Sequence, residues 1–179
     1  MGWFGKPKLD LEALVAANYT ALYRYAYRLS GSAQEAEDLT QDTFCQAQTK
    51  LHQLREPERA KSWLFTILRN GYLHRLRERK QEKQVPLDGL AEIPERVPEP
   101  LPIVDSVQLQ RALNELPEVF RTPVILYYFE EFSYRDIAEQ MNVPLGTVMS
   151  RLARAKTYLR ERLTDQADLM AKATQGEVL

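Results

Sequence analysis

The sequence predicts an all-α protein with two small helical domains joined by a proline-rich acidic linker. Apolar residues recur at helical spacing, and no strand-type alternation of any length occurs. Glycine, which tight sheet turns favour, is scarce at seven of 179 residues. Five prolines gather between residues 84 and 105, where no long helix can cross. We therefore expect domains at residues 1–83 and 106–165, a linker at 84–105 and a tail at 166–179.

The composition argues against several classes of protein. A hydrophobic share of 44% is normal for a soluble chain, and the net charge is −1. The single cysteine, Cys45, excludes an intrachain disulfide, and with only His52 and His74 beside it no zinc spacing can be recognised. The first residues lack the apolar core of a signal peptide, and no segment approaches the roughly 18 apolar residues of a membrane span. We expect a soluble, cytoplasmic protein without a metal or other cofactor.

Three helices are expected in the N-terminal domain. The first ends at Gly31, where a C-terminal cap favours a left-handed residue. The second opens with Ser32 and Glu35 at capping-box spacing, and a turn at residues 55–58 separates it from the third. The expected buried stripes are Leu11, Leu14, Val15, Asn18, Tyr19, Leu22, Tyr25, Ala26 and Leu29, then Ala36, Leu39, Thr43, Phe44, Ala47 and Leu51, and finally Trp63, Leu64, Ile67, Leu68, Tyr72 and Leu76.

The linker is expected to be extended, because each proline removes a backbone donor and disfavours helical geometry in its predecessor. It carries five acids and a single base, Arg96, so it should act as a negatively charged tether. After it, apolar spacing predicts a helix over residues 107–116, stopped by Pro117, and another within residues 118–132.

Residues 133–163 have the features of a helix-turn-helix. Ser133 can cap the first helix, and Asp136 lies at its positive end. Asn142 suits the turn, and Pro144 suits the first turn of the second helix, where its missing donor costs nothing. The buried stripe of the second helix is expected to be Leu145, Val148, Leu152, Ala155 and Leu159.

The opposite side of that second helix carries short polar groups followed by arginines. Thr147, Ser150, Arg151 and Arg154 form this outward set, and Gly146 has no side chain to keep the backbone away from phosphate. Residues near the N-terminus of a recognition helix approach base edges, and arginine pairs with guanine or phosphate. Arginines alone would also suit an ordinary solvated helix, so the complete arrangement of helix, turn and basic face predicts DNA binding.

The N-terminal domain holds two segments of opposite charge. Residues 55–83 contain nine bases against four acids, a local charge of +5, interleaved with Trp63, Phe65 and Tyr72. Stacking surfaces beside bases suit unpaired nucleotides, although Trp63 is also compatible with a place in the core. Residues 35–44 are acidic, which is compatible either with a surface that binds a partner or with an ordinary solvated helix face. Nothing nucleophilic or metal-binding accompanies these carboxylates, so we expect no enzyme activity.

This order of motifs resembles the extracytoplasmic function sigma factors, the small two-domain initiation subunits of bacterial RNA polymerase. The resemblance covers about residues 10 to 165. It rests on "LYRYAYRLSGSAQEAEDLTQDTF", "SWLFTILRNGYLHRLR", "LPEVFRTPVILYYFEEFSYRDIAEQMNVPLGTVMSRLARAK" and the linker between them. It implies core RNA polymerase and promoter DNA as partners, together with an anti-sigma factor, and places the linker in polymerase channels where nucleic acid normally runs.

The resemblance also implies roles for individual residues. The family's acidic helix docks on the clamp helices of the polymerase largest subunit, which implies this role for Asp38, Gln41, Asp42 and Phe44. Its third helix and the preceding loop capture and melt the −10 element, implying Arg55, Arg59, Lys61, Trp63, Arg69, Asn70 and Arg75. Its final helix enters the major groove at the −35 element, implying Pro144, Gly146, Thr147, Met149, Ser150, Arg151 and Arg154.

Met149 departs from the family, many members of which carry a base there. Methionine offers only apolar contact, for example to a thymine methyl group, so we expect an altered −35 preference rather than lost binding. The tail has no clear family counterpart.

Two other classes of function stay open on the sequence. A stand-alone helix-turn-helix regulator would form a stable homodimer and bind duplex DNA without polymerase. A sigma factor should instead be mostly monomeric when free and bind promoters weakly until polymerase joins. A helical enzyme is disfavoured, because Cys45, His52 and His74 form no plausible triad.

Overall fold

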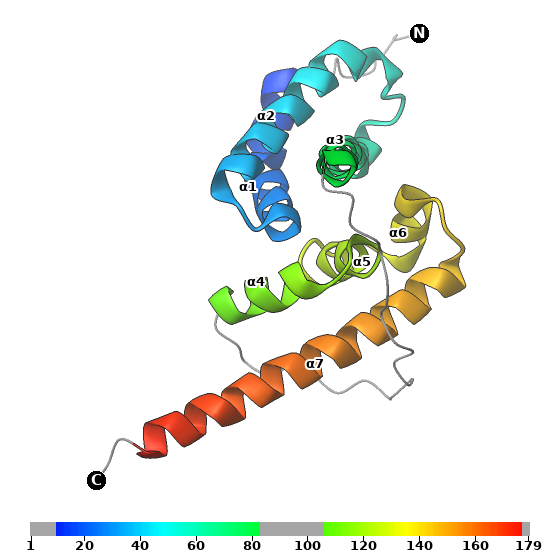
Figure 1. Ribbon diagram of the computed structural model, residues 1–179. Helices are drawn as coiled ribbons and strands as arrows, with labels where there is room; N and C mark the ends of the chain where they lie inside the picture. The colour runs from blue at the N-terminus through cyan, green and yellow to red at the C-terminus, as the bar shows by residue number, and fades with distance from the viewer. Residues whose placement is uncertain (1–9, 83–105, 177–179) are drawn as a thin grey trace, which may run out of the picture. The chain divides into compact units, whose positions relative to one another are not determined.

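The computed structural model describes the backbone of residues 10–82 and 106–176 and the side chains of residues 10–79 and 106–164. Within these ranges the chain forms helices joined by short turns, and no strand occurs, which confirms the all-α class (Figure 1). The chain divides into two compact units, Met1–Val85 and Pro86–Leu179. The expected conformation of the linker falls outside the described residues.

Unit 1 is a three-helix bundle of α1 (Leu11–Ser30), α2 (Ala33–Lys50) and α3 (Ala60–Glu82), in which each helix packs against the other two (Figure 1). The predicted stop of α1 is confirmed: Gly31 adopts φ 72° and its N–H donates to the carbonyl of Tyr27. Ser32 caps α2 by accepting from the backbone N–H of Glu35 at 3.3 Å. The side chain of Glu35 completes no capping box, because it bonds to Arg79 on α3.

The connection between α2 and α3 is built from two short 3₁₀ turns, η1 (Leu51–Gln53) and η2 (Pro57–Arg59). Pro57 opens the second turn, where a missing N–H costs no hydrogen bond. The expected turn at residues 55–58 is therefore part of a longer connection with two 3₁₀ turns, and the second of these leads directly into α3.

The core of unit 1 keeps most of the expected stripes. Its buried side chains include Leu22, Tyr25 and Leu29 of α1, Leu39 of α2, and Leu64, Phe65, Leu68 and Tyr72 of α3. Several expected positions are not in the core. Tyr19 is 43% exposed, and Phe65 rather than Trp63 takes the central position. The stripe residues that are only half-buried are Leu11, Leu14, Val15, Asn18, Phe44, Leu51, Trp63 and Leu76. Phe65 stacks on Tyr25 of α1, with ring centroids 4.9 Å apart. Phe65 therefore packs between α1 and α3 in the interior of the bundle.

Unit 2 consists of α4 (Ser106–Glu115), α5 (Glu118–Tyr128), α6 (Tyr134–Met141) and the long α7 (Leu145–Gly176). Helix α7 packs against each of the other three, and α5 also packs on α6. The expected stripe on α7 is buried at Val148, Leu152, Ala155 and Leu159, and it continues to Leu163. The backbone of α7 stays helical through most of the segment expected as a tail.

Leu145 was wrongly assigned to this buried stripe, since it is 43% exposed. Helical side chains tilt toward the N-terminus, so the side chain of the first residue in α7 points past the end of the helix. No preceding turn of α7 covers it.

Two polar side chains, Arg121 and Glu115, form hydrogen bonds between helices of unit 2. Arg121 of α5 donates to the carbonyl of Leu116 at 2.7 Å and to that of Asn114 at 2.9 Å, and so satisfies carbonyls at the end of α4. Glu115 of α4 accepts from Arg162 at 2.8 and 3.0 Å and from the Tyr158 hydroxyl at 2.9 Å. The Arg162 bonds are the main reason that the pKa of Glu115 lies below its ordinary value.

With Glu115→Gln, the free energy of unfolding should fall less steeply as the pH is lowered. Because the pKa of Glu115 is lower in the folded than in the unfolded chain, its stabilisation is complete above about pH 4.3 and is lost as pH falls through the folded pKa. The contribution should stay under about 1 kcal/mol, since both side chains are partly exposed. Denaturant unfolding followed by circular dichroism between pH 7 and pH 3.5 measures it. Glu161→Gln, at an exposed acid of α7, is the control, and an equal acid slope for both variants would contradict the expectation.

Candidate nucleic-acid interface

Helices α6 and α7 form the helix-turn-helix that the sequence predicts. Ser133 and Asp136 make a complete capping box, with Asp136 N donating to Ser133 Oγ at 3.2 Å and Ser133 N donating to Asp136 Oδ2 at 3.1 Å. Asn142 ends α6 in the left-handed region at φ 52°, and Val143 N donates to the carbonyl of Ala138 at 3.0 Å. These bonds fix a tight turn, because asparagine tolerates this backbone conformation.

Pro144 stands immediately before α7 rather than inside its first turn as expected. Its carbonyl accepts from the N–H groups of Thr147 and Val148 at 3.0 and 3.3 Å, so it starts the helix from the capping position. Gly146 follows in the first turn and is exposed, and a Cβ added there would meet no atom within 4 Å. Packing within unit 2 therefore does not require glycine, and the missing side chain leaves the helix backbone open to a ligand.

The side of α7 that faces away from the core carries the predicted polar and basic residues. Ser150 and Arg154 are exposed, Thr147 and Arg151 are half-buried, and Met149 is 51% exposed. The Ser150 hydroxyl donates to the Thr147 carbonyl at 3.0 Å and keeps its lone pairs for a ligand. The start of a helix also bears a partial positive charge, so this surface suits an anionic, hydrogen-bonding partner.

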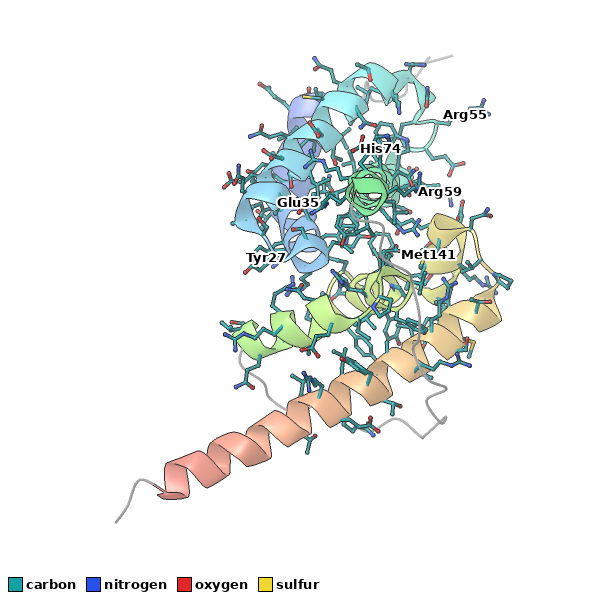
Figure 2. All side chains as sticks on the ribbon, viewed as in Figure 1. Tyr27, Glu35, Arg55, Arg59, His74 and Met141 are labelled. Carbon is teal, nitrogen blue, oxygen red and sulfur yellow. The ribbon has the colours of Figure 1, made fainter. Side chains whose placement is uncertain are left out.

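In unit 1 the predicted basic residues lie at the start of α3 and in the connection that precedes it. Arg55 projects outward from that connection (Figure 2), and Arg59 and Lys61 are also exposed. The Lys61 ammonium lies 5.7 Å from the centroid of the Phe65 ring, one turn further along α3. Asn70 is exposed, whereas Trp63, Arg69 and Arg75 are half-buried.

Of the three aromatic rings in this segment, the structure buries two, and the burial of Tyr72 confirms its place in the predicted stripe. Phe65 is 0% and Tyr72 is 4% exposed, so neither ring can receive a base without unfolding unit 1. They lie on the side of α3 that faces α1 and α2, whereas Trp63 lies closer to the solvent edge. Trp63 is thus the ring of the three that remains partly accessible.

The predicted partner-binding residues of α2 separate into two groups. Asp38 and Gln41 are exposed and point away from the bundle. Asp42 instead pairs with Arg75 of α3, a residue that the resemblance assigns to DNA. Phe44 is half-buried and stacks on Tyr19 of α1, with centroids 6.3 Å apart and planes at 8°.

Two residues that sequence reasoning missed bear on these surfaces. Tyr19 forms the surface beside Phe44, and Arg79 binds Glu35 at the seam between α2 and α3. Helical spacing could have placed Tyr19 at the edge of the stripe on α1, but only the packing of α1 on α2 shows that its ring stays exposed.

Within the described parts of the chain, no cluster of three or more histidine, cysteine, aspartate or glutamate side chains could hold a metal ion. None of the helices that the structure describes is both long and apolar enough to span a bilayer.

Comparison with known proteins gives the family of both units. The family model "Sigma-70 region 2" matches residues 14–82, which contain most of α1 with α2 and α3. The model "Sigma-70, region 4" matches residues 106–159, from α4 into α7. The ECF RNA polymerase sigma factor SigW of Bacillus subtilis is 30% identical over 160 residues, which are 80% of this chain and 83% of that protein. The chain belongs to the ECF sigma factors.

Two further relatives agree with this assignment. The ECF sigma factor SigE of Mycolicibacterium smegmatis is 35% identical over 170 residues, and the match spans 90% of this chain but only 65% of that longer protein. Among solved structures, the sigma factor RpoE in complex with the anti-sigma factor NepR from Bartonella quintana is 33% identical, with a TM-score of 0.72. That match covers 87% of this chain and 97% of the other.

Membership in this family makes the chain a transcription initiation factor that gives RNA polymerase its promoter specificity. The matched region 4 of this ECF sigma factor includes α6, the turn and α7 as far as residue 159, and the acidic and basic helices lie inside the matched region 2. The matches leave residues 83–105 between them uncovered, where the sequence places the linker.

Proposed function

We propose that unit 2 of this sigma factor reads the −35 element through α7 and that unit 1 binds core RNA polymerase through α2 and the −10 element through α3. The observation that carries the proposal is the exposed polar and basic side of α7 in a complete helix-turn-helix. Contacts to DNA are proposed for Pro144, Gly146, Thr147, Met149, Ser150, Arg151 and Arg154.

The proposed −35 contacts divide by chemistry. Arg151 and Arg154 can bind guanine edges or phosphate, and Thr147 and Ser150 can bond to bases or to the backbone. Met149 has no polar donor, and its exposed thioether chain suits the methyl group of thymine. A preference for thymine opposite Met149 therefore belongs to the proposal.

For the −10 element, the proposal rests on exposed cations beside a partly accessible ring. Arg55, Arg59 and Lys61 can neutralise phosphates, and Trp63 can stack on an unpaired base. Asn70 is exposed on the same helix and can bond to a base edge, and the half-buried Arg69 and Arg75 complete the proposed set. Strand separation then needs no covalent step by the sigma factor, since preferential binding of unpaired bases favours it, and the polymerase performs the catalysis.

For the polymerase contact, the proposed surface on α2 consists of Asp38, Gln41, Asp42 and Phe44. Asp38→Arg should weaken binding to core polymerase by about five- to twentyfold, because it places a cation where a basic partner surface is expected. Fluorescence anisotropy of the labelled chain titrated with core enzyme measures this. Glu161→Arg, the same change of charge at an exposed site of unit 2, is the control, and equal affinities of the two variants would refute the contact.

An anti-sigma factor that holds the protein inactive in the cytoplasm is also proposed. The support is the solved relative RpoE, which was captured with the anti-sigma factor NepR and aligns with most of this chain. Co-purification of the tagged chain from its native cells, with identification of a partner that blocks core polymerase, tests this part.

In vitro transcription with core polymerase on a library of genomic fragments tests the main proposal. We expect initiation at a small set of promoters that share −35 and −10 sequences. Specific duplex binding by a stable homodimer, with no effect on polymerase, would instead support the stand-alone regulator, which the family matches do not favour.

A further inference from the structure

The outward-facing side of α3 carries Trp63, Asn70 and Arg77 at a regular spacing of seven residues. Seven residues make nearly two helical turns, so the direction of these side chains changes by only about 20° from one to the next. At 1.5 Å per residue, the three positions extend over roughly 21 Å of the helix. Asn70 and Arg77 are exposed and Trp63 is half-buried. The three residues therefore form one line along α3, on the side away from the core of unit 1.

The other residues of α3 agree with this orientation. Leu64, Leu68 and Tyr72 are buried on the opposite side of the helix. Arg75 and Arg79 belong to that side too, because they pair with acids of α2. Two helical positions correspond to about 200° of rotation, so Arg77, which lies between these two arginines in the sequence, points away from α2.

The charge of Arg77 is not compensated by the described part of the chain, where no carboxylate forms an ion pair with this residue. Glu78 is its neighbour in the sequence, but the Oε2 atom of Glu78 lies 3.4 Å from Nδ1 of His74, one turn back along the helix. Residues adjacent in sequence do not face each other on a helix, so Glu78 lies on a different edge from Arg77. An exposed guanidinium thus ends the line that begins at Trp63.

We propose that Arg77 binds a phosphate of the promoter backbone and extends the −10 surface of α3 by two turns beyond Asn70. This inference rests on the proposed function of unit 1 and adds a residue that the resemblance does not include. Its supports are the continuity of the line from Trp63 through Asn70 to Arg77 and the opposite charges of guanidinium and phosphate.

The spacing and chemistry favour phosphate as the ligand of Arg77. Arg77 lies about 10 Å from Asn70 along the helix axis, roughly three times the axial separation of phosphates in one strand of a duplex. A strand that reaches Asn70 can therefore continue past Arg77. Since duplex and separated strands both carry phosphates, this contact strengthens promoter binding without favouring strand separation, in contrast to a ring that stacks on an unpaired base.

Arg77→Ala in the full chain, reconstituted with core polymerase, tests the proposal. The affinity for a cognate promoter should fall about three- to tenfold, and the slope of log affinity against log salt concentration should shrink by about one. Mobility shift at several salt concentrations measures both. The loss should be equal on promoters with altered −10 bases, and permanganate should find the same open fraction among bound complexes as in the wild type. A loss confined to one base pair, or a fall in the open fraction, would overturn the phosphate contact.

Arg24→Ala is the matched control, because Arg24 is an exposed arginine of α1 in the same unit and lies outside this side of α3. Equal promoter affinities of the Arg24 and Arg77 alanine variants would overturn the inference. Arg77→Lys keeps the positive charge and should recover the salt slope of the wild type. A lysine variant with the reduced slope of the alanine variant would also contradict a contact based on charge.

Two measurements separate this contact from other effects of Arg77→Ala. Circular dichroism in denaturant should show wild-type stability, because the side chain is exposed, and fluorescence anisotropy should show unchanged affinity for core polymerase. A loss of core affinity as large as the loss of promoter affinity would overturn the inference. If the wild-type holoenzyme forms no specific promoter complex, the proposed function fails, whereas wild-type binding with no effect of Arg77→Ala refutes this inference alone.

Discussion

Arg154→Ala should lower the affinity of the holoenzyme for its promoter by about 5- to 100-fold, which corresponds to the loss of one arginine contact to a base or phosphate. Arg154 is exposed on the third turn of a helix whose first turn carries the exposed Gly146 and the half-buried Thr147. Its side chain lies opposite the buried residues Val148 and Leu152, so the substitution removes a potential contact without opening the core of unit 2.

Electrophoretic mobility shift of the reconstituted holoenzyme on a cognate promoter measures this loss. Arg111→Ala is the matched control, because Arg111 is an exposed arginine of α4 in the same unit and lies outside the helix-turn-helix. Equal affinities of the two variants would remove Arg154 from the interface. A loss that is uniform across mutated −35 sequences, with a smaller salt slope, would assign Arg154 to phosphate, and a loss of discrimination at one position would assign it to a base.

The helices were predictable because their signals are local. Gly31, Ser133 and Asn142 end or begin helices through bonds to residues within five positions, so a short window of sequence contains all that determines them. The apolar stripes on α2 and α7 are likewise periodic within one helix. Fold class and the helix-turn-helix therefore follow from the sequence with few corrections.

Several wrong predictions concern residues whose surroundings are determined by a second helix. Tyr19 and Phe65 both continue apolar patterns, and only the arrangement of three helices puts one ring at the surface and the other in the centre. The bonds Asp42–Arg75 and Glu35–Arg79 join residues 33 and 44 positions apart, a separation that helical periodicity cannot address. A charge count over one segment thus overestimated the positive field of α3, since two of its arginines are neutralised by α2.

This neutralisation changes how the two surfaces of unit 1 are understood. An acidic helix and a basic helix appear in the sequence as separate binding segments, one for protein and one for DNA. In the folded unit the two helices also bind each other, through the pairs Asp42–Arg75 and Glu35–Arg79. Part of the opposite charge that the sequence indicates is therefore compensated within unit 1.

Phe65→Ala and Trp63→Ala should separate stability from promoter melting, although the two rings are two residues apart. Phe65 is fully covered and stacks on Tyr25, so its truncation should lower the free energy of unfolding of unit 1 by about 3–5 kcal/mol. Trp63 is half-buried, so its truncation should cost less stability. If its ring stacks on an unpaired base, the same change should reduce open complexes by about 5- to 100-fold, the equivalent of about 1–3 kcal/mol.

Circular dichroism in denaturant gives the stabilities, and permanganate reactivity of unpaired thymines in the promoter gives the fraction of open complexes. Phe65→Leu is the variant that keeps unit 1 folded if alanine does not, because leucine preserves most of the apolar volume at this site. Trp63→Tyr retains an aromatic face and should recover much of the melting that alanine removes. Open complexes that track the unfolding free energy equally for Trp63 and Phe65 variants would show that Trp63 acts only through the core, and the −10 surface would then rest on its cations and Asn70.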